Sequence, residues 1–298
     1  MRSGGLFWLL AAAATAGCTG TISAAGTPDD AQTAMATSAV VIVERTVDAT
    51  QGTRAEASAR FVRVAAPSSV VEGLRAIGAS GELPARGTCA SVVSGTGGVA
   101  SDEPTPYVEL LDVGSVSLIS GANETRLLPR QVPDVTDVVT GVVYARATDP
   151  TGLPAGETYA VHVAGRSDLA AFDASAVAPP DPGDIHVAGE NPDAGTLVLA
   201  RGAAVELTWT PAATGDVVYA DAQPAAVRCV LAESEKDSDN RVHASLPASL
   251  FDDQGSLVVH RLHREPLRAP GLESGEIRFD FARSMSYVRA SVPGDSAP

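Results

Sequence analysis

Two histidines near the C-terminal end of the chain, His260 and His263, lie close enough in sequence to suggest a shared metal site. A neutral imidazole nitrogen is a common ligand of zinc and related metals. The residues around them have the pattern of a β-strand, and side chains three residues apart on a strand point to opposite faces. Only a helix or a bulge would bring the two rings together, so the spacing predicts no shared metal site. His162, His186 and His243 stand alone and are expected to be hydrogen-bonded surface or core residues.

An acid-rich segment, residues 233–240, contains four carboxylates and an amide and could suggest calcium binding. An EF-hand loop that began at Asp237 would place Val242 at its sixth position and Ala248 at its twelfth, where glycine and glutamate are required. The segment is therefore interpreted as a solvated hairpin loop.

Motifs of the common enzyme classes are absent from the sequence. The tripeptide 238–240, Ser-Asp-Asn, matches one β-lactamase motif, but no S-x-x-K or K-T-G accompanies it. The chain also lacks G-x-S-x-G, H-E-x-x-H, the P-loop and G-x-G-x-x-G. We therefore predict no catalytic residues, no metal site and no cofactor, although the absence of motifs does not exclude an unusual hydrolase or metal-dependent enzyme.

The N-terminal residues have the layout of a secretory signal. Arg2 precedes a largely apolar run from residue 6 to residue 15, and small residues follow. This run is too short to cross a bilayer stably, which requires roughly 20 residues. Residues 1–17 are therefore predicted to be an export signal that is removed.

The end of this run, Thr15-Ala16-Gly17-Cys18, resembles the lipobox of bacterial lipoproteins. It departs from that pattern at Thr15, where the family prefers leucine; the alternative is an ordinary signal peptide cut nearby. The resemblance implies cleavage before Cys18 and attachment of a lipid to its sulfur. Thr19 follows instead of the aspartate that retains such proteins at the inner membrane, which implies the outer membrane or cell surface, facing the periplasm or exterior. Residues 18–38 are mostly small and polar without periodicity, and are expected to form a flexible tether.

Cys89 and Cys229 are the two cysteines that remain once Cys18 is assigned to lipid. Export permits them to form a disulfide, because oxidising compartments preserve such bonds. Both lie in strand-like contexts and could point inward from a sheet. The alternative is two separately buried thiols, since a free cysteine behaves as a small hydrophobic residue.

The chain is strongly acidic, with 36 acids, 21 basic residues and a net charge of −15. Such a field repels phosphate backbones, so nucleic acid is excluded as a partner. The simplest reading of the charge is a soluble, self-repelling surface; binding of cations or of a basic partner is the alternative.

The composition and pattern predict an all-β fold. Hydrophobic residues make up 45% of the chain but aromatic residues only 4%, so the core is expected to consist of small and β-branched side chains, which favour strands. The five tyrosines and Trp209 are expected to be its few large fillers; a sugar-stacking platform is the alternative. Alternating runs separated by turn residues are typical of antiparallel sandwiches. The expected strands are 39–46, 57–64, 107–111, 116–119, 138–145, 158–164, 196–200, 204–210, 217–222, 227–232, 256–262, 276–282 and 285–292.

A proline-rich break at residues 178–183 divides the chain into two expected domains, 39–178 and 183–292. In the second, Val205, Leu207 and Trp209 share one face of a strand. This pattern resembles the second strand of fibronectin type III and related immunoglobulin-like domains, which implies two antiparallel β-sandwich domains. More broadly, the chain resembles uncharacterised surface lipoproteins of high-GC Gram-negative bacteria. The export signal, the sandwich pattern and the lack of catalytic motifs together predict a non-catalytic binding or structural module, held at a membrane by its lipid, with a protein or glycan partner.

Overall fold

β-Strands form most of the part of the chain that the computed structural model describes: residues 35–65, 69–92, 107–135 (133–135 by their backbone only), 139–191, 195–211, 215–234 and 236–290. All of these residues belong to one compact unit, Ala34–Pro298. The elements are β1 (Met35–Asp48), β2 (Gly52–Ala65), α1 (Val70–Ala76), β3 (Cys89–Ser91), β4 (Val108–Leu110), β5 (Val116–Ser120), β6 (Asn123–Val135), β7 (Val139–Thr148), η1 (Pro150–Gly152), β8 (Thr158–Val163), β9 (Phe172–Val177), β10 (His186–Val187), β11 (Thr196–Ala200), β12 (Val205–Trp209), β13 (Val217–Gln223), β14 (Val227–Val230), β15 (Val242–Leu246), η3 (Ala248–Leu250), β16 (Gln254–Pro266) and β17 (Ser274–Ala290).

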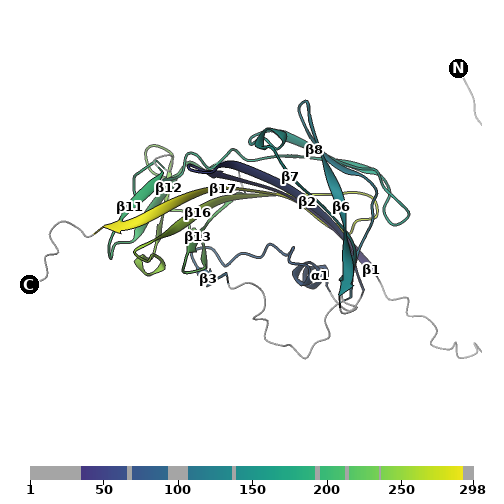
Figure 1. The fold of residues 1–298 in the computed structure, drawn as a ribbon, viewed down its shortest axis with the longest axis horizontal. Coiled ribbons are helices and arrows are strands. Elements are labelled where there is room, and N and C mark those ends of the chain that lie inside the picture. Colours follow the sequence, from purple (N-terminus) through teal and green to yellow (C-terminus); the bar gives the residue numbers. More distant parts are fainter. Residues whose placement is uncertain are drawn as a thin grey trace, which may run out of the picture. The chain divides into compact units, whose positions relative to one another are not determined.

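The strands form one large sheet and one small sheet. The 14-stranded sheet has the order β3-β14-β13-β16-β17-β1-β2-β4-β7-β6-β5-β8-β9, with β11 paired to β17, and the second sheet has the order β10-β12-β15. The predicted all-β class is confirmed. The pairing is not purely antiparallel, however, because β1 and β11 each run parallel to β17, and β4 runs parallel to β7. Long β1, β2, β16 and β17 curve through the middle of the large sheet (Figure 1).

Along the long strands, buried and more exposed side chains alternate, so that each strand keeps one face toward a core over its whole length. Along β17, Phe279 and Phe281 are fully buried on one face, while Asp280 between them points to the other. The residues expected to form two strands, 276–282 and 285–292, instead form this single strand. β1 likewise begins at Met35, because residues 35–38 pair with the end of β2. The tether predicted to run to residue 38 therefore overlaps the sheet by four residues.

One face of the large sheet carries two hydrophobic clusters. The first takes most of its members from residues 39–178, and the second takes its members from residues 185–287. β17 contributes to both, through Phe279 and Phe281 in the first and Met285 and Tyr287 in the second. The expected boundary thus separates the two clusters along the chain, but one continuous sheet joins the segments on either side of it.

The large aromatic side chains are core residues. Tyr144, Tyr159, Tyr219, Tyr287 and Trp209 are all almost completely buried, as expected for fillers of a core otherwise rich in valine and alanine. Tyr107 differs from them, because 46% of its surface is exposed. Because their rings are buried, these five residues cannot form a platform that stacks on sugars.

The opposite face of the large sheet is covered in part by α1 (Figure 1). A capping box begins this short helix: the Ser69 Oγ accepts from the Glu72 backbone N–H, and the Glu72 carboxylate accepts from the Ser69 N–H. Leu74 packs on a small cluster that includes Val40 and Val62. This helix was not expected from the sequence.

Candidate functional site

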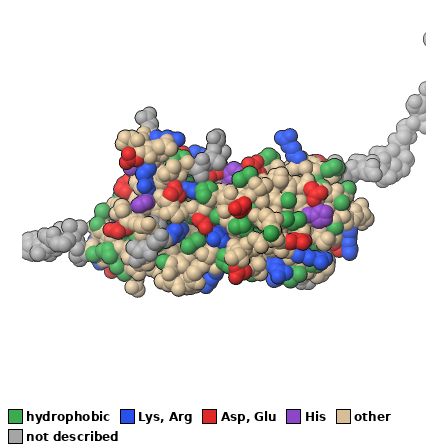
Figure 2. Space-filling model, turned by 90° about the horizontal axis from the view of Figure 1, so that it is seen from above, with side chains coloured by type: hydrophobic (Ala, Val, Ile, Leu, Met, Phe, Trp, Pro, Cys, Tyr) green, Lys and Arg blue, Asp and Glu red, His purple; other side chains and the backbone are tan. Residues whose placement is uncertain are grey.

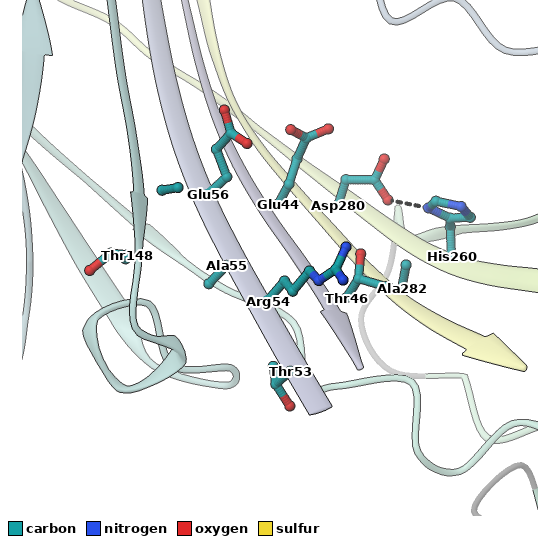
Figure 3. A pocket seen from close by; sticks show the side chains of 11 residues that line it. Glu44, Thr46, Thr53, Arg54, Ala55, Glu56, Thr148, His260, Asp280 and Ala282 are labelled. Atoms are coloured by element: carbon teal, nitrogen blue, oxygen red, sulfur yellow. Dashed lines mark hydrogen bonds and ion pairs between the residues drawn. The ribbon is translucent and has the colours of Figure 1, made fainter. Parts of the chain in front are cut away.

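Three carboxylates lie side by side on the face of the large sheet that α1 partly covers. The strand register places Glu44 of β1 opposite Glu56 of β2 on one side and opposite Asp280 of β17 on the other. Directly opposed side chains on neighbouring strands are about 5 Å apart at their β-carbons. Figure 3 shows the three carboxylates in a row and pointing the same way, with His260 continuing the row.

These residues line a hollow of about 550 Å³. It is bounded by side chains from β1, β2, β7, β16 and β17, namely Glu44, Thr46, Thr53, Arg54, Ala55, Glu56, Ala147, Thr148, His260, Asp280 and Ala282. The lining is therefore polar, with acids, threonine hydroxyls and one arginine around a short stretch of alanine. We call it the acidic hollow.

At one end of the acidic hollow, Asp280 is held by two partners. The His260 Nδ1 lies 2.9 Å from one carboxylate oxygen, and the Tyr219 hydroxyl donates to the other. The rings of Tyr219 and His260 stack, with centroids 4.2 Å apart and an angle of 9° between their planes. The pair belongs to neighbouring strands, because Tyr219 of β13 lies opposite His260 of β16 in the register.

The same network continues to β14 through a second carboxylate. Arg228 donates to both oxygens of Asp221 at 2.8 and 2.7 Å, and its guanidinium lies over the Tyr219 ring, 4.6 Å from the centroid. The Asp221 carboxylate is also 3.7 Å from the His260 Nε2. Bidentate pairing and stacking together fix the orientation of these side chains.

Burial and neighbouring charges shift the acidity of this network in opposite directions. Burial alone would raise the pKa of Asp280, but the hydrogen bonds and charges of its partners outweigh it and hold that pKa below its usual value. The pKa of Glu44 is raised, first by desolvation and then by repulsion from Asp280 and Glu56, even though its side chain remains accessible. Burial also raises the pKa of the Tyr219 hydroxyl well above its usual value.

The geometry offers hydrogen-bond acceptors and negative charge, and it holds one imidazole in place. In the part of the chain that the structure describes, no hydrogen bond joins His260 to a serine, threonine or cysteine, which a nucleophile–base pair would need. Nor do the side chains in the described ranges form a group of three or more that could hold a metal ion. His260 and His263 do not share a site, because His263 points to the other face and binds Asp216, 2.6 Å from its Nδ1.

On that other face, ion pairs hold the proline-rich residues 178–184 against the strands. Arg45 of β1 donates to Asp181 at 2.9 and 3.1 Å. Arg261 of β16, only 1% exposed, donates to Asp184 at 2.9 Å. The predicted linker is thus tied to the long strands β1 and β16.

The structure describes two of the three cysteines. Cys18 lies outside the described residues, so its lipidation stays a prediction. Cys89 and Cys229 form a disulfide, with the two cysteines directly opposite each other in the pairing of β3 with β14. Only Cys229 points into the core; Cys89 is exposed.

The remaining histidines behave as expected for residues with local partners. His162 lies 2.7 Å from Asp173 on the neighbouring strand. His243 of β15 lies 2.8 Å from Asp237, whose carboxylate also accepts from backbone N–H groups of its own loop. His186 is half-buried at the start of β10. The acid-rich segment therefore uses Asp237 to fold a loop.

Sequence reasoning did not single out Glu44, Glu56 or Asp280. A local signal was present in each case, because each acid alternates with apolar residues along a strand and must point away from the core. Their convergence depends on which strands are neighbours and in which register, and that information is not local. The parallel pairing of β1 with β17, across more than 200 residues, brings them together.

Charged side chains of both signs are interspersed on the face shown in Figure 2, with no large patch of a single sign. On this face the charges are mixed, as expected for a solvated surface. Among the described helices, none has the length and apolar character needed to cross a bilayer.

No protein-family model matches the sequence, and no curated protein matches it. Among solved structures, the full ectodomain (Ig1–Ig3) of mouse nectin-like molecule 4 is similar at 11% identity and a TM-score of 0.21, covering 87% of this chain and 66% of that one. The Fcho1 Mu homology domain of Danio rerio with a bound Eps15 peptide is similar at 10% identity and a TM-score of 0.22, covering 85% and 96%. This chain thus spans about two thirds of the nectin-like ectodomain. Scores this low carry no argument, so the immunoglobulin-like resemblance stays a prediction and the all-β class rests on the strands themselves.

Proposed function

We propose that this chain is an exported, lipid-anchored and non-catalytic binding or structural module of the cell envelope. Residues 1–17 would direct its export, and Cys18 would carry the lipid that anchors it. Residues 19–34 would separate the anchor from β1 and set how far the β-rich unit stands from the membrane. The lipid on Cys18 would insert into a bilayer, and the β-rich unit would bind a protein or a glycan.

The observation that carries this proposal is the disulfide between Cys89 and Cys229. It joins residues separated by 140 positions. Such bonds persist in secreted and periplasmic proteins and are rare in reducing compartments. The pairing therefore supports export independently of the N-terminal residues, and it leaves Cys18 as the one cysteine of the chain available for a lipid.

A binding or structural role is supported by the rigidity of the sheet that carries the loops. The long strand β17 contributes to both hydrophobic clusters and pairs with β1 and β16, so one continuous sheet carries the connections at its ends. Contact residues on proteins of this kind lie mainly on loops positioned by such a scaffold. The proposal therefore places the partner on the loops.

Crosslinking in intact cells tests the proposal. Because Lys236 is the single lysine of the sequence, the full-length chain is treated with a carboxylate-reactive dihydrazide crosslinker and a coupling reagent, and partners are recovered alongside those of a Cys18→Ser variant. We expect the unmodified chain to fractionate with membranes and to recover a partner that the variant loses. Recovery of nothing above background, or a Cys18→Ser variant with unchanged membrane fractionation, would count against the proposal.

One observation favours a second candidate, an envelope hydrolase without a recognised motif. The acids and His260 lie together in the acidic hollow, and His260 with Asp280 has the geometry of an oriented general base. Turnover of p-nitrophenyl acetate, phosphate and glycosides, measured for the native chain and for His260→Gln, separates the candidates. Turnover that His260→Gln abolishes would favour the hydrolase; equal background rates would favour the binding module.

A further inference from the structure

A segment without long regular structure follows α1 and leads to the edge of the large sheet. We call residues 77–92 the strap. It runs on the face that α1 partly covers and ends with the three residues of β3, which pair with β14 (Figure 1). β3 is the terminal strand of the large sheet in the described part of the chain, so the strap closes an edge that would otherwise be open.

The first half of the strap is held by arginines of the sheet. Arg278 donates to the carbonyl of Ser80 at 2.9 Å, and Arg264 donates to the carbonyl of Gly81. A β-carbon on Gly81 would lie 2.1 Å from the Arg278 Nη1, and the residue has a φ of +57°, so glycine is required there. Leu83, partly buried, packs on a small apolar cluster that contains Tyr219.

The second half of the strap is held by backbone hydrogen bonds and by the disulfide. The Gly87 N–H donates to the carbonyl of Val230 at 2.9 Å, and the Val230 N–H donates to the carbonyl of Thr88 at 3.1 Å. All three residues of β3 are exposed, so this half contributes no side chain to a core. The covalent bond from Cys89 to Cys229 is the strongest fastening on the segment.

We propose that the strap is a redox-controlled cover of the β14 edge. A dithiol reductant attacks the disulfide at the exposed Cys89, forms a mixed disulfide with one cysteine and is then resolved by its own second thiol. Two electrons and two protons pass to the protein, which leaves with two cysteine thiols, and the reductant leaves as its internal disulfide. The second half of the strap then detaches, and the backbone groups of β14 that pair with β3 become exposed to solvent.

Detachment is local, because the strap and the sheet depend on different contacts. β14 keeps its pairing with β13, and Cys229 stays within the second hydrophobic cluster. The strap itself has few buried apolar contacts, and its backbone hydrogen bonds lie at an edge of the sheet. Segments of this kind open locally at a free-energy cost well below that of global unfolding. This proposal goes beyond the binding or structural role in the cell envelope. It does not depend on a lipid at Cys18, because it concerns only the strap and the disulfide between Cys89 and Cys229.

Hydrogen exchange on the full chain, before and after addition of dithiothreitol, tests the proposal. In labelling of seconds to minutes, peptides that cover residues 86–92 and the β14 strand should exchange at least about tenfold faster after reduction, while peptides from β1 and β17 stay protected, because they exchange only through the much rarer global unfolding. No change in residues 86–92, or an equal rise throughout the sheet, would overturn it. The Cys89→Ser/Cys229→Ser double variant should match the reduced protein and should not respond further to dithiothreitol.

Trypsin gives a second readout that does not depend on the variants folding. Arg86 lies in the exposed part of the strap, so cleavage after it should speed up several-fold on reduction. Arg86→Gln removes this cleavage and identifies the band. A cleavage rate at Arg86 that dithiothreitol leaves unchanged would contradict the proposal.

Discussion

Two irregular segments cross the large sheet, one on each face, and they are fastened by different chemistry. Residues 178–184 are held by arginine–aspartate pairs, Arg45 with Asp181 and Arg261 with Asp184. The strap on the other face is held at carbonyl groups, at a strand edge and by a disulfide. The first segment lies in the chain between Ala178 of the first hydrophobic cluster and Ile185 of the second; the second segment lies at an exposed edge of the sheet.

The two kinds of contact differ in how easily they can be released. Removing one member of a buried ion pair leaves a charge without compensation, so the first segment cannot detach cheaply. A disulfide at the surface restrains its segment strongly while intact, and chemistry can reverse it without disturbing a core. Residues 178–184 therefore act as permanent structure, although their composition suggested a boundary between domains.

Loss of the disulfide should have the largest effect on stability. The bond closes a loop of about 140 residues, and the chain-entropy model gives a stabilisation of about 4 to 5 kcal/mol, usually less in practice. The Cys89→Ser/Cys229→Ser double variant should lower the free energy of unfolding by that order, measured by urea denaturation with Trp209 fluorescence. Cys18→Ser should change nothing in the same assay. A loss below about 1 kcal/mol would mean that the bond barely restrains the unfolded chain.

Asp184→Ala should destabilise next most strongly. It leaves the guanidinium of Arg261, whose side chain is 2% exposed, without its carboxylate, and it removes an acceptor from the Thr210 N–H. Because Asp184 itself is partly accessible, we expect about 3 kcal/mol, the lower end for a broken buried pair. Asp253→Ala is the control, since its pair with Arg201 is exposed and should contribute under about 1 kcal/mol. Equal losses in the two variants would show that residues 178–184 are fastened no better than a surface loop.

Ser69→Ala should have a smaller effect on stability, confined to α1, the helix that precedes the strap. It removes the side-chain acceptor of the capping box that begins α1, which is typically worth about 1 kcal/mol. Hydrogen exchange of residues 70–76 should rise, and that of β17 should not. Ser91→Ala, on exposed β3, is the matched control. If both variants leave exchange in α1 unchanged, the helix depends on the packing of Leu74 and not on its cap.

Glu44→Gln should have the smallest effect and the opposite sign. The folded-state pKa of Glu44 is raised, so the ionised form destabilises the folded protein at neutral pH. The substitution should therefore raise the free energy of unfolding at pH 7 by at most about 1 kcal/mol, and the gain should vanish as pH falls below about 4.3, the usual carboxyl value. Urea midpoints at both pH values, with Glu124→Gln as an exposed control, measure it. A gain that persists at low pH would assign the effect to something other than charge.

The sequence predicted the elements whose signal is local. β11 has the bounds expected for it, and Trp209 and four tyrosines fill the core as their alternation and size indicated. β6 is not among the strands expected from the sequence. A proline in a strand interior is unusual, yet Pro129 lies within β6 and pairs with Tyr144 of β7 in the structure. The capping box at Ser69 and Glu72 is a local signal for the start of α1, but a helix of seven residues is too short to show a helical hydrophobic period.

The candidate site could be predicted only in part, because its geometry depends on register between distant strands. That Asp280 points away from Phe279 and Phe281 follows from alternation alone. That it faces Glu44 and His260 follows from β17 pairing with β1 in parallel and with β16 in antiparallel order. No periodicity within any one segment encodes those neighbours.

The intact mass of the protein recovered from cells tests the central claim most directly. The account predicts a chain that begins at Cys18 and carries two or three acyl chains, with Cys89 and Cys229 resistant to alkylation until a reductant is added. A mature chain that begins after Cys18 and carries no acyl mass would contradict the anchor. Alkylation of Cys89 and Cys229 without reductant would contradict the oxidised fold and remove the independent support for export.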